Sequence, residues 1–205
     1  MLKMSAVEKK VLVVDDEAIP RDRLGGAFAK CEEIKFKVYL AEYAREADGL
    51  ISKNAFDVVT VDLKLGSDVE AGFLWMQKQL LLSSCPEAVK IVVTMFPDRE
   101  NVIRAMRAGA WDFVFKGEGV YETETVKRAV QRLKELAEAE RVEKFLFGDW
   151  FPKNEQRLHK EFPGEHLAVD GEGNIIAHGR SRIELGEAFP PEWLKGGRKA
   201  FILHL

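Results

Sequence analysis

Short apolar runs recur along the first part of the chain, and segments of mixed polarity separate each run from the next. The runs that fit buried strands are VLVV (11–14), FKVYL (36–40), DVVTVD (57–62), KIVVT (90–94) and WDFVFK (111–116). An almost unbroken apolar run of this length is typical of a parallel strand that is covered on both faces of its sheet. The pattern therefore predicts five strands between residues 11 and 116.

Helical periodicity fills the intervals between these runs. Pro20 and Pro97 stand where helices can begin, and Gly109 stands where one can end. Further helices are expected over residues 44–52, over 71–83 with Cys85-Pro86 as the stop, and over about 122–147. Strands that alternate with helices favour a parallel sheet covered on both faces, and right-handed crossovers then favour a doubly wound fold.

Polar side chains stand where the predicted strands end. Asp15 and Asp16 follow the first run, Asp62 closes the third, Thr94 closes the fourth and Lys116 closes the fifth. Ligands of open α/β sheets bind beyond the carboxyl ends of the strands, so these groups are expected to converge. Taken singly, an aspartate at a strand end is usually a cap and a lone lysine is usually solvated. Taken together and in order, they favour one functional site.

The residue types indicate the chemistry of that site. Clustered carboxylates offer the hard oxygen ligands that Mg²⁺ takes, and a cation would offset the repulsion between Asp15 and Asp16. A carboxylate can also act as a nucleophile toward a phosphoryl group, a reaction that needs neutralised oxygens more than proton chemistry. Mg²⁺, the Lys116 ammonium and the Thr94 hydroxyl would supply that neutralisation.

Composition narrows the class of protein. The 205 residues are 46% hydrophobic and 32% charged, an ordinary globular composition with room for a medium domain and a small one. A net charge of -3 gives no basic surplus for nucleic acid. Cys31 and Cys85 lack metal-ligand spacing, and no apolar run is long enough for a signal core or a bilayer span. A cytoplasmic location is therefore expected.

The ordered site residues and their flanking runs resemble the receiver domain of two-component response regulators. The similarity rests on VLVVDDEAIPRDRL (11–24), DVVTVDLKL (57–65) and KIVVTMFPDRENVIRAMRAGAWDFVFK (90–116), and it covers about residues 9–137. The resemblance implies a flavodoxin-like, doubly wound five-stranded parallel sheet. It also implies a signalling protein rather than an enzyme, with a histidine kinase as the partner that donates the phosphoryl group.

The resemblance assigns a role to each residue of the acidic site. Asp62 would accept the phosphoryl group from the kinase's phosphohistidine. The cofactor Mg²⁺ would be held by Asp15, Asp16, Asp62 and the backbone carbonyl of Lys64. Thr94 would donate a hydrogen bond to a phosphoryl oxygen.

The resemblance also implies a switch. Lys116 would pair with Asp62 and then with the phosphoryl group. Phe113 falls on the family's switch-aromatic position. The aromatic side chain there turns inward when Thr94 moves, and this movement couples a change of charge at Asp62 to a distant surface. Judged from composition alone, Phe113 is as often a core residue as a switch. For its neighbour Trp111 a core position is the preferred interpretation.

Several positions depart from the receiver pattern. Gly117 follows the lysine where the family usually has a cis-proline, Met95 and Phe96 follow the threonine where a small residue is usual, and Gly66 stands where proline is common. These departures leave every reacting group in place, but they motivate an alternative in which a degenerate receiver is a constitutive protein-interaction scaffold. An Mg²⁺-dependent phosphohydrolase ranks last, because Lys64 stands where such an enzyme needs a second acid.

The chain changes character over residues 148–205. The segments HLAVD (166–170) and NIIAH (174–178) flank a Gly-rich turn and predict a β-hairpin. Ser181 would cap a short helix that Pro190-Pro191 ends, and KAFILHL (199–205) predicts a last strand. This part resembles a small family of uncharacterised domains. It does not resemble a helix-turn-helix output domain, because it has too few helices and a balanced charge.

These features divide the chain into a receiver domain (1–138), a helical linker that continues its last helix (139–150) and a small α+β domain of unknown function (151–205). The last domain is expected to be a non-DNA-binding output module with an unknown protein partner, and to bind neither nucleic acid nor membrane. Homodimerisation on phosphorylation stays open.

The predicted hairpin brings two histidines together. If Ala168 pairs with Ile176, His166 faces His178 across the strands, and such a pair is a candidate for metal binding or pH sensing. Two histidines without a carboxylate or thiol beside them are more often plain surface residues, so this hypothesis ranks low.

Overall fold

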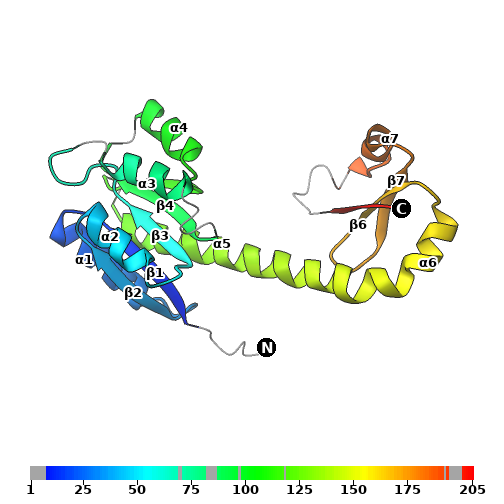
Figure 1. The fold of residues 1–205 in the computed structure, drawn as a ribbon, viewed down its shortest axis with the longest axis horizontal. Coiled ribbons are helices and arrows are strands. Elements are labelled where there is room, and N and C mark those ends of the chain that lie inside the picture. The colour runs from blue at the N-terminus through cyan, green and yellow to red at the C-terminus, as the bar shows by residue number, and fades with distance from the viewer. Residues whose placement is uncertain are drawn as a thin grey trace. The chain divides into compact units, whose positions relative to one another are not determined.

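The structure, a computed structural model, describes residues 8–68, 71–81, 87–96, 98–117, 119–191, 193 and 200–205. The chain forms two compact units, Met1–Lys134 and Glu135–Leu205, and each is described by itself. Figure 1 shows the helices and strands of both. None of the helices in the described residues is long and apolar enough to cross a membrane.

The first unit is built on a parallel sheet. Its strands are β1 (Lys9–Val14), β2 (Phe36–Ala41), β3 (Val58–Val61), β4 (Val89–Thr94) and β5 (Asp112–Phe115). The strand order is β2-β1-β3-β4-β5, and every neighbouring pair is parallel. This order is that of the flavodoxin-like doubly wound fold, so the predicted fold class is confirmed. The strand order switches between β1 and β3, the position at which open α/β sheets bind ligands beyond the strand ends.

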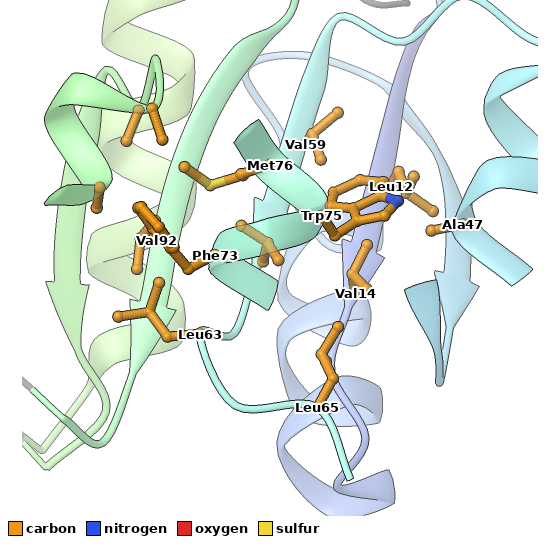
Figure 2. Packing of buried hydrophobic residues seen from close by; sticks show 14 of the residues in the cluster. Leu12, Val14, Ala47, Val59, Leu63, Leu65, Phe73, Trp75, Met76 and Val92 are labelled. Carbon is orange, nitrogen blue, oxygen red and sulfur yellow. The ribbon is translucent and has the colours of Figure 1, made fainter. Parts of the chain in front are cut away.

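Alternate residues of each strand enter two different cores, because successive side chains of a strand point to opposite faces. On one face Leu12 and Val14 pack with Trp75 and Met76 of helix α3 (Ala71–Leu81), as Figure 2 shows. On the other face the cluster comes from the strands, from helix α1 (Ala18–Ala29) and from helix α5 (Tyr121–Glu143). Burial on both faces explains why the strands read as almost continuous apolar runs.

Two further helices complete the first unit, α2 (Ala44–Ile51) and α4 (Arg99–Arg107). The starts of α1 and α4 differ from the expectation based on proline. Helix α1 begins before Pro20, with Glu17 at its N-cap. Helix α4 begins after Asp98, whose side chain accepts a hydrogen bond from the Asn101 N–H. Pro97 and Cys85-Pro86 lie outside the described residues.

The second unit contains a three-stranded antiparallel sheet of order β7-β6-β8, formed by β6 (His166–Val169), β7 (Ile175–Gly179) and β8 (Phe201–His204). Helix α6 (Phe151–Glu161) contributes Leu158 to the core on one face of this sheet. Helix α7 (Arg182–Glu187) contributes Leu185 to the other face. As predicted, the Ser181 side chain caps α7 by accepting a hydrogen bond from the Glu184 N–H.

Helix α6 was not expected from the sequence, which predicted the preceding helix only to about residue 147 and no helix directly after it. Pro152 occupies the first turn of α6, where proline is tolerated. A π-helix (Lys144–Trp150) joins α5 to α6. Val142 and Leu146, within the segment expected to be a linker, are buried in the core of the second unit.

The register of the hairpin differs by one residue from the expected one. Ala168 pairs with Ala177 rather than with Ile176, and an irregularity follows between Ala168 and Val169. As a result His178 lies opposite Leu167, and its Nδ1 is 2.7 Å from the Oε2 of Glu165. The expected pairing of His166 with His178 is therefore wrong.

Candidate functional site

The polar residues at the strand ends come together as the sequence predicted, at the carboxyl edge of the first unit's sheet. Asp15 follows β1, Asp62 follows β3, Thr94 ends β4 and Lys116 follows β5. Their exposed fractions are only 3%, 6%, 0% and 8%. Burial of four polar residues at one place is costly unless they satisfy each other, so their mutual contacts decide what the site can do.

Three carboxylates form an acidic cluster. Asp15, Asp16 and Asp62 each place one oxygen within 4.8 Å of the others, and Asp16 is the most exposed of the three. Carboxylate oxygens at this spacing are the donors that hard divalent cations prefer, and partial exposure leaves room for water ligands. The residues present therefore fit a divalent metal ion.

Lys116 joins two of these carboxylates. Its Nζ lies 2.7 Å from Oδ2 of Asp15 and 2.6 Å from Oδ2 of Asp62. Burial alone would lower the pKa of the Lys116 ammonium, but the charges of Asp62 and Asp15 outweigh that effect and raise it. Lys116 is therefore held as a cation, and it partly neutralises the cluster.

The two acids that Lys116 joins differ in their other contacts. Burial raises the pKa of Asp15, because the attraction of Lys116 only partly offsets the loss of water. One Asp15 oxygen also accepts a hydrogen bond from the Glu17 N–H at 3.0 Å. Oδ1 of Asp62 accepts a hydrogen bond from the backbone N–H of Lys64 at 3.2 Å. Lys64 thus adjoins Asp62 through its backbone.

Thr94 and Phe113 occupy neighbouring strands beside the acids. The Thr94 carbonyl accepts a hydrogen bond from the Lys116 N–H at 2.9 Å, which ties the ends of β4 and β5 together. The Thr94 hydroxyl oxygen is 3.4 Å from the Phe96 N–H that donates to it. Phe113 pairs with Val92 across the β4–β5 ladder and is partly buried against the core that α3 and α4 cover.

Arg21 is a further residue of the site that the sequence analysis missed. Its Nη1 donates a hydrogen bond of 2.8 Å to the backbone carbonyl of Asp15, and its Nη2 lies 4.0 Å from a carboxylate oxygen of Glu42. Arg21 thereby joins the loop that carries the acids to the end of β2. A cation in the first turn of a helix interacts unfavourably with the helix dipole. The position of Arg21 in the sequence could therefore have indicated that its side chain has a specific partner.

Two glycines of the site lie in close contact with their neighbours, Gly72 with backbone and Gly117 with a side chain. A Cβ on Gly72 would lie 1.8 Å from the carbonyl oxygen of Asp62, and the Gly72 N–H donates to the Leu63 carbonyl at 2.9 Å. A Cβ on Gly117 would lie 2.3 Å from the Phe115 ring. Any side chain at Gly117, where the family usually has proline, would therefore have to displace the Phe115 ring.

Comparison with known families identifies the first unit. The family model described as the response regulator receiver domain matches residues 11–131, more than half of the chain. The chain belongs to the response regulator receiver family. The resemblance inferred from the strand-end residues is thus confirmed, and it makes the first unit a receiver module of two-component signalling.

Curated relatives of this receiver include two regulators. AlgB of Pseudomonas aeruginosa, an alginate biosynthesis transcriptional regulatory protein, is 31% identical over 114 residues, which make up 55% of this chain and 23% of AlgB. The regulatory protein VirG of Rhizobium rhizogenes is 28% identical over 170 residues, which make up 82% of this chain and 68% of VirG. This chain therefore spans less than a quarter of the length of AlgB.

Solved structures of receivers share the fold. A Burkholderia pseudomallei response regulator, crystallised with a phosphorylated aspartic acid, a calcium ion and citrate, matches with a TM-score of 0.52 and 26% identity over 65% of this chain and 72% of that one. A CheY-like receiver domain of Methanospirillum hungatei matches with a TM-score of 0.54 and 24% identity over 62% of this chain and 95% of that one. The second likeness concerns the fold alone.

Proposed function

We propose that this response regulator accepts a phosphoryl group on Asp62 from the phosphohistidine of a histidine kinase, in a reaction that requires Mg²⁺. The observation that supports this role is the surroundings of the Asp62 carboxylate. It lies at the centre of the site, 2.6 Å from the Lys116 ammonium and within 4.8 Å of the oxygens of both Asp15 and Asp16.

The proposed reaction is a direct phosphoryl transfer. A carboxylate oxygen of Asp62 forms a bond to phosphorus while the bond from phosphorus to the kinase imidazole breaks, and the imidazole keeps the electron pair of that bond. The reaction needs positioning and charge neutralisation more than proton chemistry. Mg²⁺ bound by Asp15, Asp16, Asp62 and the Lys64 carbonyl would supply positive charge to the phosphoryl oxygens.

The chain's own residues would do the rest. Lys116 would exchange its contact with Asp62 for one with a phosphoryl oxygen, and its pKa keeps it charged for that purpose. The Thr94 hydroxyl would donate to another phosphoryl oxygen. Because Thr94 is tied to Lys116 and lies one strand from Phe113, its movement would reach Phe113, the proposed switch aromatic.

Intact mass after incubation with Mg²⁺ and acetyl phosphate tests the proposal. We expect one phosphoryl group on the wild-type chain, none after chelation of the metal and none on Asp62→Asn. Asp57→Asn is the matched control, because Asp57 is a partly buried aspartate next to the opposite end of β3 and contacts Lys9 instead. An adduct that survives in Asp62→Asn would refute the assignment of the acceptor.

The alternative function is a constitutive scaffold that is not phosphorylated. The observation that favours it is that Lys116 already pairs with both Asp15 and Asp62, so part of the acidic charge is balanced without a metal. Absence of any adduct from acetyl phosphate and from histidine kinases, with Mg²⁺ shown not to bind, would favour the scaffold. Sustained turnover of phosphate esters would instead favour the third hypothesis, an Mg²⁺-dependent phosphohydrolase.

For the whole chain we propose a receiver over residues 1–138 and an output module over 151–205 that contacts a protein rather than DNA. The proposed helical linker over 139–150 joins them and contributes Val142 and Leu146 to the core of the second unit. The mixed α+β build of the second unit and the chain's net charge of -3 support this role. AlgB acts in transcription, so DNA binding is the outcome that would overturn it. Fluorescence anisotropy with duplex DNA, before and after phosphorylation, provides the test.

Two properties of the whole protein belong to the same proposal. We place it in the cytoplasm, in keeping with its free Cys31 thiol. The protein would also form a homodimer on phosphorylation. Light scattering would show this as a higher molar mass for the phosphorylated wild-type chain than for Asp62→Asn treated in the same way.

A further inference from the structure

Two histidines of the second unit lie directly opposite each other on neighbouring strands. His166 begins β6, His204 ends β8, and the antiparallel register pairs them. Their rings are stacked, with centroids 4.4 Å apart and an angle of 23° between the ring planes. This pairing replaces the one expected from the sequence, in which His166 faced His178.

The surroundings of the pair leave its nitrogen atoms available. Within the described part of the chain, neither imidazole has a hydrogen-bond or ion-pair partner, whereas His178 contacts Glu165. His204 is exposed and His166 is partly exposed, so solvent reaches both rings. On its other side His166 pairs with Gly179, which has no side chain to compete for the space.

An imidazole that is not protonated is a good ligand for borderline divalent metals such as Zn²⁺. Zinc–nitrogen bonds measure about 2.0–2.1 Å, so the two nitrogens bound to a tetrahedral ion lie about 3.3 Å apart. The two rings are stacked with their centroids 4.4 Å apart, so a shared ion requires rotation of the side chains that turns one nitrogen of each ring toward it. Water would complete the coordination, because both rings face solvent.

We propose that His166 and His204 form a two-imidazole site for a borderline transition-metal ion, for which Zn²⁺ is the probe. The ion would join β6 to β8. Strand β8 pairs with β6 and contributes Leu203 to the core, so the ion would hold this strand on the sheet. The site is separate from the acidic cluster of the receiver and does not depend on the proposed phosphorylation.

Isothermal titration of the full chain with Zn²⁺ at neutral pH, in excess Mg²⁺, tests the site. We expect the wild-type chain to bind one Zn²⁺ more than His204→Gln or His166→Gln, because each variant leaves only one of the two ligands. Any binding at the acidic cluster is common to all variants and cancels in the comparison. Zn²⁺ should also raise the unfolding temperature of the second unit in the wild type and not in these variants.

The matched control is His159→Gln, an exposed histidine in the last turn of α6, which should bind Zn²⁺ as the wild type does. If a paired variant fails to fold, ring NMR signals of the wild type decide instead, since Zn²⁺ should shift those of His166 and His204 together. Unchanged ring signals, or equal zinc stoichiometry in wild type and His204→Gln, would overturn the proposal.

Discussion

At the scale of residues, the acidic site combines charges that burial opposes. Asp15 and Asp62 are nearly inaccessible, and Lys116 reaches both at 2.6–2.7 Å. A buried ion pair gains attraction but loses hydration, so such a group is retained for its function more readily than for stability. Asp15 shows the balance most clearly, because burial raises its pKa despite the neighbouring ammonium.

Asp15→Asn is therefore expected to stabilise the protein while weakening its hold on divalent metal. A raised pKa means that the folded state keeps a proton that the unfolded chain has released, so stability falls as pH rises from the ordinary aspartate value to the raised one. Because Asn has no carboxyl group to titrate, the variant should not show this decrease of stability with rising pH. It should therefore be more stable than the wild type at neutral pH. Urea unfolding at several pH values and Mg²⁺ titration measure the two effects.

Asp16→Asn provides the control for this trade-off, because Asp16 is the more exposed member of the same cluster. It should weaken metal binding without a comparable gain in stability. If Asp15→Asn is instead less stable than the wild type at neutral pH, the attraction of Lys116 outweighs the burial of Asp15.

Thr60 carries a second unfavourable group, this one in the core. It is 1% exposed, its neighbours on the adjacent strands are Val13 and Ile91, and its hydroxyl has no hydrogen-bond partner among the described atoms. Thr60→Val keeps the shape and removes the unpaired hydroxyl, so we expect about 1 kcal/mol of added stability by urea unfolding.

Thr125→Val is the matched change, because Thr125 is equally buried but donates a hydrogen bond of 2.7 Å to the Tyr121 carbonyl. It should lower the free energy of unfolding by about 1 kcal/mol. Destabilisation by Thr60→Val would mean that the Thr60 hydroxyl does find a partner in solution.

At the scale of elements, close approach between helices and strands positions the site. Helix α3 begins so close to the end of β3 that Gly72 has no room for a side chain against the Asp62 carbonyl. Helices α2 and α3 are joined by Asp48, which accepts hydrogen bonds from Trp75, Lys78 and Gln79 at 2.7–2.8 Å. Burial opposes the charge on Asp48, but these bonds outweigh it and lower the pKa of the carboxyl group.

Gly72→Ala should therefore destabilise the receiver and slow phosphorylation of Asp62. The added methyl group must displace the backbone that carries Asp62, and overpacking of this kind costs about 1–3 kcal/mol or more. Gly49→Ala in α2 is the control, since nothing lies within 4 Å of the added carbon. That helical change should stabilise by about 0.5–1 kcal/mol and leave the phosphorylation rate unchanged. Equal effects of the two substitutions would argue against the close contact.

At the scale of the whole molecule, each unit has a core of its own. The core of the second unit is small, and Leu158 of α6 is completely buried in it, with Val142, Leu146 and Leu167 as neighbours in the same cluster. A small core depends heavily on each large side chain, because few other contacts replace it.

Leu158→Ala should cost the second unit about 2–5 kcal/mol, through lost burial and a residual cavity, and should leave phosphorylation of Asp62 unchanged. Hydrogen exchange resolved along the chain would then show lost protection in residues 135–205 only. Ile183→Ala, at an exposed position on α7, is the control and should change neither the stability of the second unit nor the phosphorylation of Asp62. Equal loss of protection in residues 8–134 would show that the two units unfold together.

The sequence by itself determined the elements of the receiver and the order of its functional groups. A short, almost continuous apolar run is typical of a strand that is covered on both faces of its sheet, and in a parallel sheet the polar residues that follow such runs lie at the same edge. This local signal was enough to predict that Asp15, Asp16, Asp62, Thr94 and Lys116 lie together, and to predict the Ser181 cap. It was not enough for α6, because a proline can end one helix or begin the next.

Only the tertiary structure decided which groups touch. Lys116 reaches Asp15 as well as Asp62, Arg21 reaches the Asp15 carbonyl, and Gly72 meets the Asp62 carbonyl, all through contacts between elements distant in sequence. The same holds for His166, whose partner is His204. A shift of one residue in register moves the side chains of one strand to the other face of the sheet. Because both faces of the second unit's sheet are buried, the apolar pattern does not choose between the two registers. Packing against α6 and α7 makes that choice, because only one register buries Leu167 on one face and Ala177 on the other.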